Sequence, residues 1–96
     1  MIFDWDAKKA LKNFRKHRVS FEIAVTVFDD PLHLSIIDPA SSQSEERWIT
    51  VGESVDNRII VAVHTYSRGE NEEETIRIIS ARPATKKETK QYEEGI

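Results

Sequence analysis

The chain has 96 residues, of which 39% are hydrophobic and 32% are charged, and these proportions predict a single folded domain, residues 1–96, with a highly charged surface. It contains no cysteine, which excludes disulfides, zinc ribbons and thiol catalysis and suits a reducing compartment. The longest apolar run, residues 59–63, is too short to cross a membrane, and the N-terminus lacks the pattern of a signal peptide, so we expect a cytoplasmic protein.

Two helices are predicted in the first third of the chain. Asp6 is a suitable N-cap for a helix over residues 7–17, in which apolar side chains recur at helical spacing. Ser20 can cap a second helix over residues 21–29, which ends before Pro31 because proline cannot continue a helix. Residues 2–4 can form a brief edge strand.

Four strands and a last helix are predicted in the rest of the chain. The strands cover residues 33–37, 45–53, 58–66 and 75–81, with an acidic hairpin loop over residues 67–74, and their polar turns favour an antiparallel meander. Thr85 and Glu88 form a capping box that starts a helix over residues 85–94. This order predicts an α+β fold, with two N-terminal helices and a C-terminal helix packed on a four-stranded antiparallel sheet.

Alternation along the strands predicts which side chains share a face of this sheet. The simplest registration packs six aliphatic side chains against the helices, namely Ile49, Val51, Val61, Val63, Ile76 and Ile78. The other face is then open and carries Trp48, Thr50, His64, Tyr66 and Arg77. Aromatic rings beside an arginine suit a nucleic-acid groove, and they equally suit an ordinary solvated face or a partner interface.

Charge is unevenly distributed around the net value of −3. Residues 7–20 contain six basic side chains and no acidic one, whereas residues 40–74 contain three basic and eight acidic side chains. A polyanion responds to the field within about 8–10 Å at physiological salt rather than to the net charge. The basic segment is therefore a candidate nucleic-acid surface, although such a charge run is more often the solvated face of a helix.

The residues that the chain lacks exclude several kinds of active site. Three glycines are too few for a glycine-rich phosphate loop, and the three histidines lie on different predicted elements, so we expect neither a metal site nor a cofactor. A cationic set remains: Lys9 and His17 share a helix face with Asn13, and three arginines come from strands, namely Arg47, Arg77 and Arg82. Metal-free RNA cleavage uses such a set, because cations hold the phosphate while a base and an acid move protons. Spacing alone leaves open that these residues are caps, packing residues or surface ion pairs.

Taken together, the ordered motifs resemble the BrnT toxin family. The first half of the chain carries Phe3-Asp4-Trp5-Asp6, Lys16-His17, Val19-Ser20-Phe21-Glu22 and Phe28-Asp29-Asp30-Pro31. The second half carries Glu46-Arg47-Trp48, Arg77-Ile78-Ile79-Ser80-Ala81-Arg82 and, after the capping box, Tyr92-Glu93. The resemblance covers about residues 2–94. The chain departs from the family pattern at Arg18, where glycine is usual, and in the acidic stretch after Arg68.

The resemblance implies a compact RelE-like fold and an endoribonuclease toxin of a type II toxin–antitoxin system. Such a toxin cleaves cellular RNA without metal and inhibits translation and growth. Its expected partner is a BrnA-type ribbon-helix-helix antitoxin, which neutralises it and through which alone it reaches operator DNA. The alternative is a catalytically degenerate toxin that acts as binding partner and corepressor of its DNA-binding antitoxin.

The same resemblance implies a set of site residues. The expected catalytic residues are Lys9, His17, Arg47, Arg77 and Arg82, which match family positions. The roles are our own inference from side-chain chemistry: proton transfer for His17 or Lys9 and phosphate binding for the arginines. Strand alternation places Arg47 with Ile49 against the helices, unless it lies at the strand start where the sheet edge opens. Further RNA contacts are expected from Lys8, Lys12, Lys16, Trp48, His64 and Tyr92.

Overall fold

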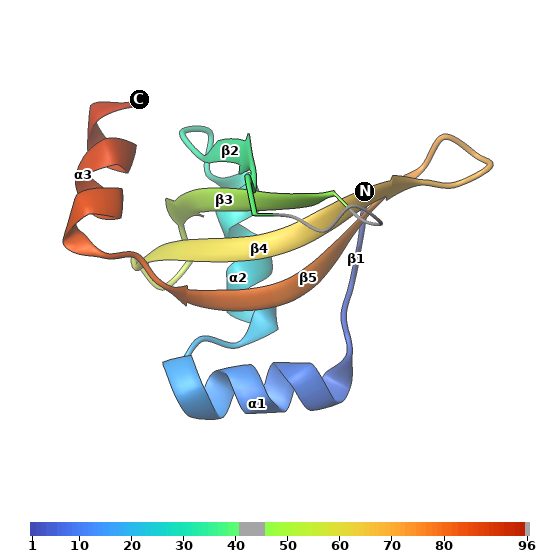
Figure 1. The fold of residues 1–96 in the computed structure, drawn as a ribbon, viewed down its shortest axis with the longest axis horizontal. Coiled ribbons are helices and arrows are strands. Elements are labelled where there is room, and N and C mark those ends of the chain that lie inside the picture. The colour runs from blue at the N-terminus through green and yellow to red at the C-terminus, as the bar shows by residue number, and fades with distance from the viewer. Residues whose placement is uncertain (41–45, 96) are drawn as a thin grey trace.

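Residues 1–40 and 46–95 are described by a computed structural model, which places five strands in one sheet with three helices around it (Figure 1). In chain order, the elements are β1 Ile2–Asp4, α1 Ala7–His17, α2 Phe21–Val25, the 3-10 turn η1 Thr26–Asp29, β2 Leu34–Ile37, β3 Arg47–Glu53, β4 Ile59–Arg68, β5 Glu74–Pro83 and α3 Lys86–Glu94. None of these helices is long and apolar enough to cross a membrane.

The helices begin where their capping residues predict. The Asp6 carboxylate accepts hydrogen bonds from the backbone N–H groups of Lys8 and Lys9 at 2.8 and 3.1 Å. Thr85 and Glu88 complete the predicted capping box of α3. The second helix is shorter than predicted, because residues 26–29 tighten into η1 after α2 ends at Val25. Local hydrogen-bonding side chains thus fix the entry points of the helices.

The sheet is mixed and has the strand order β1-β5-β4-β3-β2. β1 pairs with β5 in parallel, and the other neighbours are antiparallel. The prediction of a four-stranded antiparallel sheet is therefore wrong, because residues 2–4 join it as a parallel edge strand. β4 and β5 also extend into the predicted loop and leave only residues 69–73 between them. A strand of three residues is too short for its sequence to indicate that it pairs with β5, more than seventy positions away in the chain.

Helix α2 and the turn η1 cover the opposite face of β4 and β3 from the predicted one, and α1 packs on β5. Thr50 pairs with Ala62 and Gly52 with Ile60 on the covered face. A Cβ atom on Gly52 would lie 3.0 Å from the Val27 carbonyl oxygen, so glycine permits the close approach of η1. The core on this face comprises Val19, Phe21, Ala24, Val27, Ile60, Ile76, Ile78 and Ala81. Alternation grouped the residues of β3 and β4 correctly, but both groups are apolar enough to be buried.

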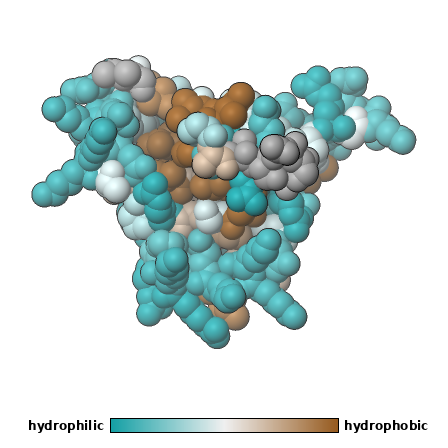
Figure 2. All heavy atoms as spheres, in the orientation of Figure 1, coloured by the Kyte–Doolittle hydropathy of each residue, from teal (hydrophilic) through white to brown (hydrophobic). Residues whose placement is uncertain are grey.

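The sheet face opposite α1 and α2, here called the open face, is turned toward the viewer in Figures 1 and 2. Helix α3 lies on one end of it, where Gln91 and Tyr92 border a small hollow with Ile49 and Val51. Hydrophobic residues gather over β2 and β3, between the hydrophilic α3 and the hydrophilic β4–β5 hairpin (Figure 2). Ile36 contributes to this surface with 60% exposure.

A β-bulge changes the alternation of β5 in the middle of the strand. His64 pairs with Ile78 and Val63 pairs with Ser80, so Ile79 is the additional residue. Arg77 and Arg82 are five positions apart and would point to opposite faces of a regular strand. The bulge places both of them on the open face.

Candidate functional site

A row of polar side chains crosses the open face. Arg47 pairs with Thr65 across β3 and β4, and Thr65 pairs with Arg77 across β4 and β5. Directly opposite residues share a face of a sheet, so these three residues, here called the arginine row, lie side by side. Two strand spacings separate the Cα atoms of the arginines by roughly 10 Å. The prediction that packed Arg47 against the N-terminal helices is wrong, and its correction brings Arg47 beside Arg77.

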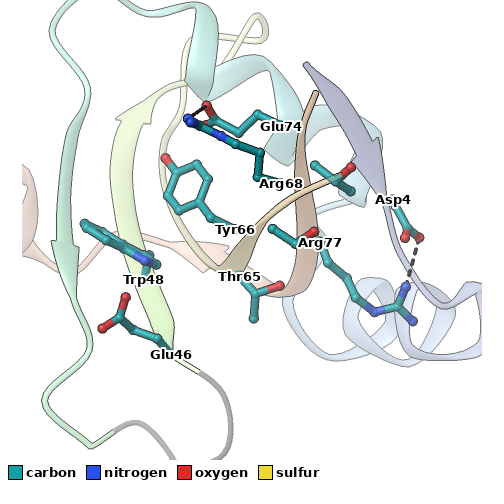
Figure 3. A pocket seen from close by; sticks show the side chains of 10 residues that line it. Asp4, Glu46, Trp48, Thr65, Tyr66, Arg68, Glu74 and Arg77 are labelled. Atoms are coloured by element: carbon teal, nitrogen blue, oxygen red, sulfur yellow. Dashed lines mark hydrogen bonds and ion pairs between the residues drawn. The ribbon is translucent and has the colours of Figure 1, made fainter. Parts of the chain in front are cut away.

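A pocket of about 730 Å³ opens where β1, β4 and β5 meet the start of β3 (Figure 3). This Arg77 pocket is lined by Asp4, Glu46, Trp48, Thr65, Tyr66, Ser67, Arg68, Glu74, Thr75 and Arg77. The rings of Trp48 and Tyr66 meet edge to face with their centroids 5.4 Å apart. By register, Trp48 and Tyr66 share the covered face with His64, whereas Thr65 and Arg77 lie on the open face. The pocket therefore takes its guanidinium fork for phosphate and its aromatic pair for stacking a base from opposite faces of the sheet.

Arg77 reaches this pocket with its side chain 47% exposed. Its Nη1 donates to Asp4 Oδ1 at 2.9 Å, and the Asp4 side chain is 46% exposed. An ion pair between two exposed groups contributes about 0–1 kcal/mol, so an incoming phosphate can displace the carboxylate at little cost. Arg77 is the predicted arginine that is best placed to meet a ligand.

Arg82 and Arg47 have different surroundings. Both terminal nitrogens of Arg82 donate to the Glu88 carboxylate, at 2.7 and 2.8 Å, and this pair lowers the pKa of Glu88 to about 2. Because Glu88 belongs to the capping box, Arg82 secures the start of α3, roughly 15 Å along β5 from Arg77. Arg47 is half-buried, and its buried Nε has no hydrogen-bond partner within residues 1–40 and 46–95.

Lys9 and His17 lie along a second depression, the α1 groove, between α1 and the edge of β5. It has a volume of about 450 Å³ and is lined by Lys9, Lys12, Asn13, Lys16, His17, Ile79 and Ser80. Lys8 is exposed outside both depressions. Arg18 adopts φ 59° and donates its N–H to the Phe14 carbonyl at 2.8 Å, so it ends α1 in the conformation that glycine usually supplies. Arg18 therefore ends the helix as glycine would, and His17 still lines the groove.

The α1 groove and the Arg77 pocket approach each other at the N-terminus of α1. Hydrogen bonds from the backbone N–H groups of Lys9 and Lys8 lower the pKa of Asp6, and the charges of Lys9 and Arg77 lower it further. The Asp6 carboxylate therefore interacts electrostatically with Lys9 of the α1 groove and with Arg77 of the pocket. Predicted site residues from α1 and β5 form neighbouring surfaces rather than one cluster.

His64 lies on the covered face, so the prediction that it points to an open face is wrong. It is fully buried between the rings of Phe28 and Tyr66, with centroid distances of 4.9 and 5.0 Å. Its Nε2 is 2.7 Å from Thr50 Oγ1, which is itself 2.7 Å from Ser35 Oγ. Burial lowers the pKa of His64 to about 4. A side chain without exposed surface has no direct access to RNA in this fold.

The neutral, buried His64 leads us to expect a loss of stability in mild acid. The unfolded chain protonates this histidine near pH 6.5, whereas the folded chain does so only near pH 4. The unfolded state therefore binds more protons in this window, and the free energy of unfolding falls by about 2 kcal/mol between pH 7.5 and 5. Urea denaturation at both pH values measures the change. His64→Gln keeps a polar group but cannot titrate, and an equal fall in this variant would rule out His64 as the cause.

Tyr92 connects α3 to the segment after η1. Its hydroxyl donates to the Asp30 carboxylate, and this hydrogen bond raises the pKa of Tyr92 to about 12. Asp30 also accepts from the backbone N–H groups of Leu32 and Glu53, at 2.9 and 2.8 Å. Tyr92 thus anchors α3 and does not line the Arg77 pocket.

Several pocket residues were absent from the predicted site: Asp4, Glu46, Thr65 and Tyr66. Thr65 becomes visible only through its pairing with both Arg47 and Arg77, which is a property of the register. Glu46 had a signal in the sequence, because it directly precedes Arg47-Trp48 in the Glu-Arg-Trp motif. Trp48 was predicted on the open face, which is wrong because it pairs with His64 on the covered face, but its side chain does line the pocket.

Comparison with known proteins identifies the family. The family model described as the ribonuclease toxin BrnT of a type II toxin–antitoxin system matches residues 5–88. The crystal structure of the Brucella abortus ribonuclease toxin BrnT is similar with a TM-score of 0.56 and 22% identity, over 90% of this chain and 100% of that one. Comparison with curated proteins finds no match. The structural likeness establishes the fold and the family model spans most of the sequence, so the chain belongs to the BrnT family of ribonuclease toxins of type II toxin–antitoxin systems.

Proposed function

We propose that this chain is an endoribonuclease toxin, which cleaves cellular RNA without a metal ion and so inhibits translation and growth. The observation that carries the proposal is the Arg77 pocket, whose lining includes a guanidinium, the Thr65 side chain and the rings of Trp48 and Tyr66. This combination suits an unpaired ribonucleotide, whose base stacks on aromatic rings and whose phosphate binds the arginine fork. Membership of a ribonuclease toxin family and the RelE-like fold expected for it agree with this assignment.

The proposed reaction is attack of a ribose 2′-oxygen on the adjacent phosphorus, with departure of the 5′-oxygen of the next nucleotide. Negative charge grows on the non-bridging oxygens, and Arg77 stabilises it by donating from two nitrogens. The products are a 2′,3′-cyclic phosphate and a free 5′-hydroxyl. A base must accept the 2′ proton, and an acid must protonate the leaving oxygen.

For the base we propose Glu46. It lines the pocket, whereas Asp4 is paired with Arg77 and Glu74 lies 3.9 Å from Arg68. Lys9 and His17 are kept as candidates for the acid, because the α1 groove approaches the pocket near Asp6. We assign the contacts with flanking phosphates to Lys8, Lys12 and Lys16, which are exposed on α1.

The proposed partner is a BrnA-type antitoxin of the ribbon-helix-helix class, which caps the toxin and alone contacts operator DNA. The family belongs to type II systems, in which toxin and antitoxin are both proteins. Two surfaces of this chain suit a protein partner: the exposed apolar residues over β2 and the acid-free basic helix α1. We place this complex in the cytoplasm.

One observation favours the alternative of a degenerate toxin retained as a corepressor. Carboxylates already hold two of the three predicted phosphate-binding arginines, since Asp4 pairs with Arg77 and Glu88 with Arg82. In a corepressor these ion pairs would persist, and the protein would bind its antitoxin without cleaving RNA.

Purified protein incubated with cellular RNA in EDTA distinguishes the two functions. For a metal-independent ribonuclease we expect discrete fragments that end in 2′,3′-cyclic phosphate and disappear when the antitoxin is added in excess. Expression in cells should arrest growth, and coexpression of the antitoxin should restore it. If the folded protein leaves RNA intact with and without ribosomes, yet binds the antitoxin tightly, the corepressor function is correct.

A further inference from the structure

Thr65 occupies the centre of the arginine row, and within residues 1–40 and 46–95 its hydroxyl makes no hydrogen bond. The residue is only 7% exposed. In Figure 3 its hydroxyl is turned toward β5, and no hydrogen bond joins it to the other residues drawn. In the part of the chain that the structure describes, the buried side-chain atoms without a partner are Arg47 Nε and His64 Nδ1, and the Thr65 oxygen is not one of them. Because Thr65 lines the Arg77 pocket, its hydroxyl is open to a ligand there.

The neighbours of Thr65 indicate what kind of ligand suits its hydroxyl. Arg47 and Arg77 pair with it on the adjacent strands, so a ligand at the hydroxyl lies on the sheet face that carries both arginines. Thr65 also lines the same pocket as Arg77. An anion with several oxygen acceptors fits these three donors, and a phosphodiester has two non-bridging oxygens for them.

We propose that the Thr65 hydroxyl donates a hydrogen bond to a non-bridging oxygen of the phosphodiester that Arg77 and Arg47 hold, an assignment that rests on the proposed ribonuclease function. Threonine suits this task because its branched side chain has few rotamers on a strand, and the central position in the sheet keeps the donor rigid. The hydrogen bond strengthens as charge grows on phosphate oxygen, so it favours the transition state.

Thr65→Val tests the proposal because valine keeps the shape and β-propensity of threonine but removes the hydroxyl. A hydrogen bond to a charged group predicts a fall in kcat/KM for RNA cleavage of about ten- to a hundredfold. Thr65→Ser retains the donor and should keep most of the activity. Thr89→Val on α3 is the matched control, because Thr89 is also partly buried but lines no part of the Arg77 pocket.

Binding measurements separate this contact from a change in overall charge. The probe is a mixed-sequence RNA oligonucleotide with 2′-fluoro sugars, which binds but cannot undergo 2′ attack, followed by fluorescence anisotropy at several salt concentrations. We expect Thr65→Val to weaken binding equally at every salt concentration, because no cation is lost. Arg77→Ala should instead lower the slope of log K against log salt by about 0.7, the value for one single-strand phosphate contact.

The outcomes distinguish this inference from the proposed function. Cleavage and binding by Thr65→Val at the wild-type level would overturn the inference while leaving the ribonuclease intact. If wild type binds the oligonucleotide without cleaving RNA, cleavage fails as the function, and weaker binding by Thr65→Val still supports the phosphate contact. If wild type does neither, both fall. Should valine lower the melting temperature, Thr65→Ser and Thr65→Ala provide a pair that differs only in the hydroxyl, and equal activity in that pair overturns the inference.

Discussion

Arg77→Ala is expected to lower kcat/KM for RNA cleavage about a hundred- to a thousandfold, the usual loss when one donor to a developing oxyanion is removed. Two exposed arginines line the pocket, and Arg68 is held by both Glu72 and Glu74, whereas the single ion-pair partner of Arg77 among the described residues, Asp4, is displaced at little cost. Arg77→Lys should recover only part of the activity, because an ammonium group supplies charge without the planar fork that binds two oxygens. Initial rates on a defined RNA in EDTA measure both effects.

Arg15→Ala is the control for Arg77→Ala. It removes the same charge from an exposed position on α1 that lines neither the Arg77 pocket nor the α1 groove. We expect cleavage within about twofold of wild type, since a single exposed charge contributes little. Equal losses in the two variants would show that net charge, rather than the fork of Arg77, determines the rate. An unchanged rate in Arg77→Ala would move the reaction away from this pocket.

Features that depend on neighbouring residues in the chain were predicted from the sequence. Asp6 and Ser20 cap α1 and α2 where their side chains indicated, and the Thr85–Glu88 box starts α3. These hydrogen bonds join residues two or three positions apart, so the sequence contains both partners. The family was also recognisable, because the order of short motifs is a property of the sequence alone.

The antiparallel order of β2 to β5 was predicted, but the features that depend on exact strand register were not. β4 has aliphatic residues on both faces, because α2 buries one face of the sheet and α3 covers part of the other, so alternation could not identify the core side. Gly52 held the decisive signal, since only the face with glycine can approach η1 so closely. The bulge at Ile79 has no local marker such as glycine, yet it determines that Arg82 shares a face with Arg77.

In the candidate site, too, some residues are positioned by local sequence and others by strand register. Lys9, Asn13 and His17 were predicted to share a helix face, and they line one groove together with Lys12 and Lys16. The arginine row depends on register, so Thr65 could not be identified before the strands were paired. Asn13 shares the α1 groove with the cations, but it is buried and holds α1 against the sheet.

Asn13→Ala is expected to lower the free energy of unfolding by about 3 kcal/mol. β1 pairs with β5 only as far as Arg77, and beyond that point α1 lies along the edge of β5. The Asn13 amide replaces the missing strand, because Nδ2 donates to the Ala81 carbonyl at 2.8 Å and Oδ1 accepts from the Ala81 N–H at 3.1 Å. Nδ2 also donates to the Val19 carbonyl at 3.1 Å. Three buried hydrogen bonds at about 1 kcal/mol each give the expected loss.

Asn13→Asp should be at least as destabilising as Asn13→Ala, although it has almost the same shape. The carboxylate would place an oxygen where Nδ2 now donates, so it would face the carbonyl groups of Val19 and Ala81. Urea denaturation measures both variants, with Lys12→Ala as an exposed control on the same helix that should change stability by less than about 0.5 kcal/mol. A loss below about 1 kcal/mol in both variants would mean that the apolar contacts of α1, rather than Asn13, dock it on β5. A large loss means that the amide fixes the position of α1, and with it that of Lys9 and His17 relative to β5.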